Sequence, residues 1–309
     1  MSKRVRVKAP ATISNLNCGF DVIGLAMNEP FDIIEMEILD RPVIEIAGIS
    51  GCQGLSTDPG KNVVGAVLRA VMDKTDGNTG FRVKLAKGIN PGSGIGSSGA
   101  SSAAAAYAAN MLLGSRFSMN EVIGFAMEGE RMVSGSAHAD NVAPALMGGI
   151  TLIRSYEPLD VVQINIPSDL WCAVLHPDIE VRTAESRAVL DKEIPLKTAV
   201  KQWGNLAGLI AGLYSSNYDL IGRSLTDYVA EPKRAKLIPD FYEIRNAALN
   251  SGAIGAGISG SGPSVFALCR GRESAVKAGK AMEDVLISRN KKFRSYVSQV
   301  NTVGTTTCL

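Results

Sequence analysis

The residues best suited to chemistry form a run of glycine and serine at positions 91–102, followed directly by four alanines at 103–106. Glycine lets the backbone turn its N–H groups toward one point, and alanine propagates a helix from that point. The start of a helix attracts anions, because its first N–H groups lack partners and its dipole favours negative charge. The run therefore predicts a phosphate-binding loop rather than a serine-rich linker.

The loop contains the pattern G-x-G-x-x-G at 94–99, but two common nucleotide motifs are incomplete. The dinucleotide motif needs an acidic residue about 20 positions later, and the nearest one, Glu121, is better explained as part of a helix cap. The Walker pattern G-x-x-x-x-G-K-[ST] is absent from the sequence. What the loop predicts by itself is an anion site.

A magnesium ion beside bound phosphates takes hydroxyl and carboxylate oxygens. Ser98 stands where the loop becomes helix, so its hydroxyl is a candidate ligand. Glu130, late in the next expected helix, is a candidate carboxylate. Glu128 lies two residues earlier and must point to a different face of that helix. From spacing alone, a solvated surface carboxylate is the favoured interpretation of either glutamate.

Two polar clusters lie outside this loop. Residues 138–141, His-Ala-Asp-Asn, fit either an ordinary polar loop or a set of contacts to a ligand's amino or hydroxyl group. Asn15 and Asp21 follow the first expected strand, and they are either turn formers or ligand contacts. Both interpretations stay open on the residues alone.

The second half of the chain carries two further features. A second glycine-rich run at 255–264 has more glycine than a hairpin turn needs. It suggests close approach of the backbone to a ligand or to the other half of the chain. Arg187 and Arg234 are surface residues by default, but together they would suit bidentate recognition of a carboxylate.

The elements that must position these residues follow an α+β pattern. Asp58-Pro59 suits the start of a helix, and Ser118 with Glu121 forms a capping box for another. In the first half, strands are expected over 4–9, 31–38, 43–47, 81–85, 150–154 and 161–166, and helices over 58–72, from the loop to 113, and 118–132. In the second half, strands are expected over 171–175, 254–258, 265–269 and 296–300, and helices over 183–190, 197–214, 239–250 and 273–288. We expect two domains, 1–166 and 167–309.

Composition excludes several classes of protein. The 309 residues carry a net charge of +2 without a basic block, so no nucleic-acid partner is expected. No apolar run approaches the roughly 20 residues of a membrane helix, and the N-terminus lacks the apolar core of a signal peptide. Five scattered cysteines argue against zinc and against a disulfide framework, and they fit a reducing cytoplasm.

Three segments together resemble the motifs of the GHMP kinase superfamily of small-molecule kinases. Residues 8–21, from Lys-Ala-Pro-Ala-Thr to Gly-Phe-Asp, resemble motif one. Residues 91–102 resemble the phosphate loop P-G-x-G-x-G-S-S-A, and residues 257–264 resemble motif three. Their order and spacing agree over nearly the whole chain. The resemblance implies a two-lobed α+β fold, with an N-terminal ATP-binding lobe like ribosomal protein S5 domain 2 and a C-terminal ferredoxin-like lobe.

Within the superfamily, further segments resemble the branch that phosphorylates the side-chain hydroxyl of L-homoserine, a step toward threonine. These are residues 138–144, Glu231-Pro232 with Arg234, and 237–239. The resemblance implies ATP and Mg²⁺ as cofactors and homoserine as substrate. A homodimer is a candidate assembly. The alternatives are a GHMP kinase for another small alcohol and, less favoured, a catalytically silent ligand sensor.

The resemblance also implies roles for individual residues. Ser98 and Glu130 hold Mg²⁺, Asn62 lies near the nucleotide base, and Asn141 faces the reacting hydroxyl. The phosphates are held by Lys87, Pro91, Gly92, Ser93, Gly94, Ile95, Gly96, Ser97, Ser98, Gly99, Ala100 and Ser101. The amino acid is surrounded by Asn15, Asp21, His138, Asp140, Asn141, Thr183, Arg187, Arg234 and Gly260, with the two arginines on its carboxylate. The residues implied as catalytic are Glu130, Ser98, Lys87 and Asn141.

One position departs from motif one, because Asn17 stands where the family usually has glycine. Asparagine tolerates left-handed backbone better than most residues do, so we expect the turn to survive. Asn141 cannot act as a base, and Asp140 is better used to pair with the substrate ammonium. We therefore expect catalysis without a dedicated side-chain base, driven by positioning and charge neutralisation.

Overall fold

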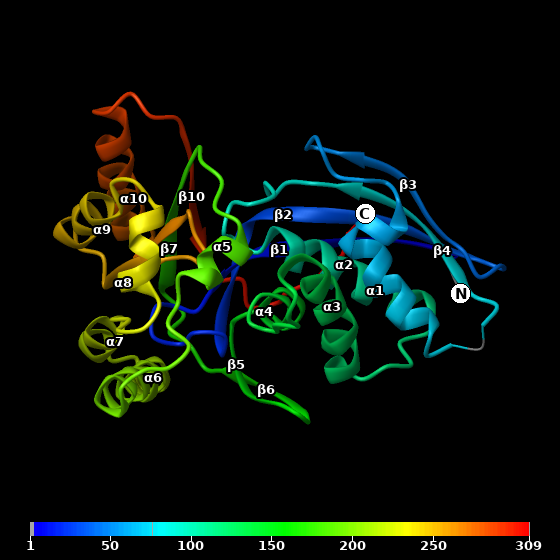
Figure 1. Cartoon of the computed structure of the whole chain (residues 1–309), viewed down its shortest axis with the longest axis horizontal. Coiled ribbons are helices and arrows are strands. Elements are labelled where there is room, and N and C mark those ends of the chain that lie inside the picture. The colour runs from blue at the N-terminus through cyan, green and yellow to red at the C-terminus, as the bar shows by residue number, and fades with distance from the viewer. Residues whose placement is uncertain (1–2, 76, 309) are drawn as a thin grey trace.

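Two β-sheets organise the residues that this computed structural model describes, 3–75 and 77–308 (Figure 1). The first sheet has the strand order β11-β1-β2-β4-β3, with β5 paired to β2 and β6 paired to β5. Its strands are β1 (Arg4–Ser14), β2 (Ile23–Leu39), β3 (Ile44–Ser50), β4 (Gly80–Ala86), β5 (Ile150–Tyr156), β6 (Leu159–Ile164) and β11 (Thr306–Thr307). The second sheet has the order β10-β7-β9-β8, formed by β7 (Leu170–Pro177), β8 (Gly255–Ile258), β9 (Val265–Arg270) and β10 (Phe293–Gln299).

The helices of the first lobe stack on the first sheet (Figure 1). They are α1 (Val63–Met72), α2 (Ser97–Leu112), α3 (Met119–Ser134) and α4 (Val142–Met147). Helix α2 packs directly on β1 and β2, while α1 and α3 pack against it from the other side. A helix covered on all sides needs small side chains, which explains why the four alanines of residues 103–106 are fully buried. The alanine run that follows the glycine loop is therefore a packing requirement as well as a helix former.

The second lobe holds α5 (Thr183–Ala188), α6 (Leu196–Ser215), α7 (Tyr218–Ser224), α8 (Glu231–Arg234), α9 (Phe241–Asn250) and α10 (Gly271–Ile287). Helices α9 and α10 pack on its four-stranded antiparallel sheet and bury a second core there. The two lobes are joined by bonds between strands, since the Asn28 N–H donates to the Ser298 hydroxyl at 2.7 Å. None of the helices in the described part of the chain is long and apolar enough to cross a membrane.

Most predicted elements are present, with shifted ends. The capping box of Ser118 and Glu121 is confirmed in full, and α2 begins at Ser97, directly after the glycine loop. The helix expected from Asp58 starts as a 3-10 turn capped by the Asp58 carboxylate before α1 begins. The strand expected over 31–38 is the second half of the much longer β2. Four short elements, α4, α7, α8 and β11, were not predicted.

The domain division at 166/167 stays a prediction. It falls between β6, which pairs with the first sheet, and β7, which begins the second. Near the C-terminus, however, β11 returns to pair with β1 through Val7 and Lys8. The last described residues therefore pack with the first lobe.

Candidate functional site

A cavity of about 540 Å³ lies between the two lobes, and most of the predicted site residues line it. These are Asn15, Asp21, Asn62, Lys87, Pro91, Gly92, Ser93, Gly94, Gly96, Ser97, Ser98, Ser101, Glu130, His138, Asp140, Asn141, Thr183, Arg187, Arg234 and Gly260. Of the remaining predicted residues, Ile95, Gly99 and Ala100 are buried behind the loop. Tertiary folding thus brings residues from both lobes to one cavity.

The glycine loop reaches the cavity in a conformation that only glycine adopts readily. Gly92, Gly94 and Gly96 have φ values of 70°, 79° and 69°. Gly96 is the N-cap of α2, and among the described residues no side chain caps the start of this helix. Because the first N–H groups of a helix need partners, the start of α2, whose Ser97 and Ser98 line the cavity, is suited to bind an anion.

Two serines of the second glycine run hold this loop from the opposite lobe. The Ser259 hydroxyl donates to the Gly94 carbonyl at 2.7 Å, and the Ser264 hydroxyl donates to the Ser93 carbonyl at 2.6 Å. A carbonyl and the N–H of the same peptide point in opposite directions, so this holds the loop N–H groups away from the second lobe. A Cβ on Gly94 would lie 2.4 Å from the Gly262 carbonyl oxygen, so the close approach requires glycine.

Lys87 lies beside the loop, but its ammonium is bonded inside the protein. It donates to the Ser97 carbonyl at 2.9 Å and to the Ser101 hydroxyl at 2.9 Å, and it pairs with the Asp32 carboxylate. Burial lowers the pKa of Lys87, and the charge of Asp32 opposes this effect. Sequence reasoning missed Asp32. Its signal was available, because strand alternation places this acid on the same face as the buried Ile34.

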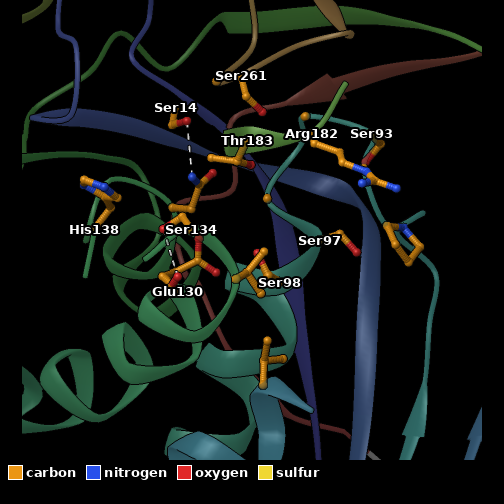
Figure 2. Close-up of a pocket in the computed structure, with 18 of the residues that line it drawn as sticks. Ser14, Ser93, Ser97, Ser98, Glu130, Ser134, His138, Arg182, Thr183 and Ser261 are labelled. Carbon is orange, nitrogen blue, oxygen red and sulfur yellow. Dashed lines mark hydrogen bonds between the residues drawn. The ribbon is translucent and has the colours of Figure 1, made fainter. Parts of the chain in front are cut away.

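Glu130 and Glu128 have different surroundings, which spacing could not show. Glu128 is a surface residue that pairs with Arg131 at 3.1 Å. Glu130 is buried, lines the cavity, and has an Oε1 atom without a hydrogen-bond partner in the described residues. The surface interpretation is therefore wrong for Glu130. Figure 2 shows its side chain and that of Ser98 turned toward the same space.

This pair fits a divalent cation. Burial raises the pKa of Glu130, while the Ser98 hydroxyl and the charge of Lys87 oppose the rise. An unpaired buried polar atom costs about 1–3 kcal/mol, and a cation would supply the missing partner. Mg²⁺ takes further oxygens from phosphates and water, so it does not need a complete set of protein ligands. No group of three or more acidic, histidine or cysteine ligands occurs in the described residues.

The other end of the cavity holds a cluster of paired charges. Both terminal nitrogens of Arg187 bond to the Asp21 carboxylate, at 2.8 and 3.1 Å. His138 Nδ1 lies 3.6 Å from the same carboxylate, and burial lowers the pKa of this histidine. Tyr156 fixes the position of Asp21 by donating to its backbone carbonyl at 2.6 Å. The Arg187 Nε and the His138 Nε2 are buried without partners among the described atoms.

Arg234 completes this cluster from α8. Its side chain is buried, and its Nη1 donates to the Gly260 carbonyl at 2.7 Å. Burial and the nearby Arg187 lower the pKa of Arg234 to about 10, so it is still charged at neutral pH. Both guanidinium groups lie over the ring of Phe20, at 5.5 and 5.1 Å from its centre. Two guanidinium groups over one ring are suited to an anion such as a carboxylate.

Asp140 and Asn141 are neighbours in the chain, but they differ in their surroundings and in their hydrogen bonds. Burial raises the pKa of Asp140 to about 7, and the charges of Asp21 and Glu130 add to this rise. The Asn141 amide is fixed at both ends, because its oxygen accepts from the Thr12 hydroxyl at 2.7 Å and its nitrogen donates to the Ser14 hydroxyl at 3.2 Å. Asn141 thus orients the start of α4 within the cavity.

The remaining predicted residues border the cavity with mostly structural contacts. The Asn62 amide caps α1 by accepting from the Val64 N–H at 3.0 Å. Asn15 has a φ of 71° and accepts from the Asp21 N–H at 3.0 Å. Asn17 has a φ of 60°, which confirms that the turn survives its departure from glycine. Its side-chain nitrogen also donates to the carbonyls of Leu225 at 2.9 Å and Ala256 at 3.1 Å, which ties the two lobes together.

Comparisons with known proteins point to one family. The model of the GHMP kinases N terminal domain matches residues 62–149, and that of the GHMP kinases C terminal domain matches residues 209–288. The chain is 46% identical to the homoserine kinase of Chlorobium phaeobacteroides strain BS1, over 95% of both chains. It is 45% identical to that of Chlorobaculum tepidum, over 98% of this chain and 97% of the relative.

Solved structures agree with this grouping. The crystal structure of homoserine kinase from Cytophaga hutchinsonii matches with a TM-score of 0.95 and 44% identity, over 100% of this chain and 98% of the other. A mevalonate kinase from L. major, solved with R-mevalonate, matches with a TM-score of 0.72 and 17% identity, over 97% of both chains. The second likeness shows a shared fold.

The raised pKa of Asp140 predicts a pH dependence of stability. In the ligand-free protein the folded state keeps a proton on Asp140 up to about pH 7, whereas the unfolded state releases it near the ordinary value of 3.8. Stability from this group is therefore present at low pH and is lost as the pH rises toward 7. Asp140→Asn removes the titrating group. The unfolding free energy of the variant minus that of the wild type should therefore increase from pH 4.5 to pH 7.5.

Urea unfolding at several pH values measures this difference. The matched control is Asp73→Asn, which changes an exposed aspartate that does not line the cavity. Its difference from the wild type should stay nearly constant with pH. Parallel stability curves for Asp140→Asn and the wild type would contradict the assignment.

Proposed function

The chain belongs to the GHMP kinases, and within them to the homoserine kinases, and from this membership we propose how its cavity binds two substrates and joins them. Its activity is the ATP-dependent phosphorylation of the side-chain hydroxyl of homoserine, on the route to threonine. The observation that carries the assignment of residues is the uncapped start of α2, which opens into the same cavity as Asp21, Arg187 and Arg234.

We place the triphosphate of ATP at residues 91–101. The left-handed glycines and the free N–H groups at the start of α2 supply donors for phosphate oxygens. Asn62, on the same cavity wall, marks the end that receives the nucleotide base. The contacts of Lys87 support an indirect role toward the phosphates, which is argued in the next subsection.

We propose that Ser98 and Glu130 hold Mg²⁺ beside the phosphates. The support is the partnerless Oε1 of buried Glu130, next to a hydroxyl and within reach of the phosphate loop. When bound, the ion would neutralise charge on the transferred phosphoryl group. Ser98 and Glu130 would hold the ion near the start of α2, where the helix dipole also favours the negative charge of the phosphates.

We place homoserine at the charged end of the cavity. Its carboxylate suits Arg234, which is charged, and Arg187. The Arg187 Nε is a buried donor that has no partner among the described residues. Its ammonium suits the carboxylates of Asp140 and Asp21. A site with two cations and two acids fits a zwitterion better than a simple acid. His138, Asn15, Thr183 and Gly260 border this space.

The reaction on this proposal needs no dedicated side-chain base. Asn141, the residue facing the hydroxyl by family resemblance, is an amide whose oxygen already accepts from Thr12. Asp140, next to it, is engaged by the substrate ammonium. The hydroxyl attacks the γ-phosphate while the bond from that phosphorus to the ADP oxygen breaks, and its proton passes to the phosphate or to water. Loose phosphoryl transfer tolerates this arrangement, because positioning and charge stabilisation supply most of the acceleration.

Three smaller points stay predictions. They are a cytoplasmic location, a homodimer, and the absence of nucleic-acid and membrane partners. The cysteines of the described chain are all free, with Cys18, Cys172 and Cys269 buried, and a reducing compartment keeps thiols in this state.

A coupled assay of ADP release tests the substrate. L-Homoserine should be turned over with Mg-ATP, and hydroxy acids without an amino group, such as mevalonate and shikimate, should have a kcat/KM lower by about 10²-fold or more, because the acids of the site would lose their partner. A preference for an acid without an amino group would support the other small alcohols. Binding of ATP and homoserine without turnover would support the silent sensor.

Glu130→Gln tests the metal site. It should raise the Mg²⁺ concentration for half-maximal activity by about 10-fold or more, because a charged ligand is lost. Direct titration with Mn²⁺, followed by electron paramagnetic resonance, should show the same loss. The matched control is Glu128→Gln, two residues away on the surface, which should leave both curves unchanged. Equal metal affinity in the two variants would show that Glu130 is not a ligand of the metal ion.

Single-turnover rates test the absence of a base. Asp140→Asn should weaken homoserine binding, and its rate at saturating homoserine should fall by less than about 10⁴-fold, the upper range for loss of a general base. Asn141→Ala should lower the same rate through lost orientation. If Asp140→Asn lowers the chemical step beyond that range with binding intact, Asp140 is the base and the proposal fails.

A further inference from the structure

A single buried carboxylate holds both ends of the phosphate loop. Asp32 lies on β2 and is completely buried. Its Oδ1 accepts from the Gly88 and Ile89 N–H groups, at 3.0 and 3.1 Å, where the chain enters the loop. Its Oδ2 accepts from the Ser101 hydroxyl at 2.8 Å, in the first turns of α2, and from the Lys87 ammonium. The carboxylate thus fastens the entry of the loop to its exit.

The Lys87 ammonium has no proton left for a phosphate. An ammonium carries three N–H bonds, and those of Lys87 are directed at Asp32, the Ser97 carbonyl and the Ser101 hydroxyl. Only 2% of its side chain is exposed. Breaking any of these bonds to reach a ligand would cost a buried carboxylate, carbonyl or hydroxyl one of its hydrogen bonds.

The loop's own side chains hold it only in part, through the Ser93 hydroxyl, which donates to the Asn90 carbonyl at 2.6 Å, and the Ser97 hydroxyl, which donates to the Ile89 carbonyl at 2.9 Å. Glycine gains the most conformational freedom when it is not held, and the loop residues with left-handed backbone carry no Cβ to pack. A buried ion pair is retained at little cost only when every donor and acceptor is satisfied. Asp32 and Lys87 meet this condition, and their partners are all in or beside the loop.

We propose that Asp32 and Lys87 form a positioning pair for the phosphate loop, and that Lys87 acts on ATP without touching it. The pair holds the entry strand, the Ser97 carbonyl and Ser101 in the arrangement that presents the free N–H groups of α2 to the cavity. This inference rests on the proposed binding of the triphosphate by residues 91–101.

Asp32→Asn separates this role from direct contact. If Lys87 were a phosphate ligand restrained by Asp32, neutralising the carboxylate would free the ammonium, and ATP would bind as tightly or more tightly. If the two residues position the loop, the same change loosens it and ATP binds more weakly. Lys87→Met weakens ATP binding under either role, so Asp32→Asn is the decisive variant.

The experiment measures dissociation constants of ATP and of adenosine by calorimetry on the full chain, without homoserine. We expect Asp32→Asn and Lys87→Met each to weaken ATP binding by about 10-fold or more, with adenosine binding changed by less than about 2-fold. Homoserine KM should also stay near the wild-type value, because the charged end of the cavity is untouched. The matched controls are Glu35→Gln on β2 and Lys84→Met on β4, the strand that ends just before Lys87. Both change exposed charges and should leave both constants unchanged.

Ser101→Ala tests the same proposal if Asp32→Asn or Lys87→Met does not fold. It removes only the hydroxyl that bridges the pair to α2, and thermal unfolding reports whether the fold is kept. It should weaken ATP binding several-fold and spare adenosine. Unchanged ATP binding in folded Ser101→Ala, or ATP binding in Asp32→Asn at least as tight as in the wild type, overturns the pair. A wild-type chain that binds no ATP would instead overturn the proposed function itself.

Discussion

The whole site depends on holding a glycine-rich loop in one conformation. Gly92, Gly94 and Gly96 are left-handed, so sterics alone do not choose their conformation. The fold supplies the constraint from two directions. Asp32 bonds to the loop from beneath, within the first lobe, and Ser264 bonds to it from the second lobe. The positions of the backbone N–H groups that form the anion site therefore depend on these contacts from outside the loop.

Burial also affects the charge of the groups that line the cavity. Removing Glu130 and Asp140 from water raises the pKa of both carboxyl groups, so each is incomplete without a positive partner. The Arg234 guanidinium stays charged in the same cavity, and Arg187 forms an ion pair with Asp21. A phosphate and a cation therefore suit one end, and an amino acid suits the other. One cavity can thus bring a phosphoryl donor and a zwitterionic acceptor together.

Local signals in the chain predicted much of the fold. The capping box at Ser118, the helix that starts directly after the glycine loop, and the left-handed turn at Asn17 all depend on residues close in sequence, and all are confirmed. Two features of the site were out of reach of such signals. The sequence spacing favoured a surface position for Glu130, because the burial of this residue depends on packing against other elements. Asp32 was overlooked, although it shares an apolar strand face with Ile34.

The residues of the chain alone specify local chemistry: which backbone positions turn left, where a helix begins, and which segments carry acids, arginines and hydroxyls. These properties follow from neighbours a few residues apart. Folding in three dimensions chose which of these groups share a cavity and which are consumed in holding it. Ser264 bonds to Ser93 across 171 residues of sequence, and Arg187 meets Asp21 across 166. Contacts of this range are set by how sheets and helices pack, and they decide that Lys87 is bound inside the protein while the start of α2 is open.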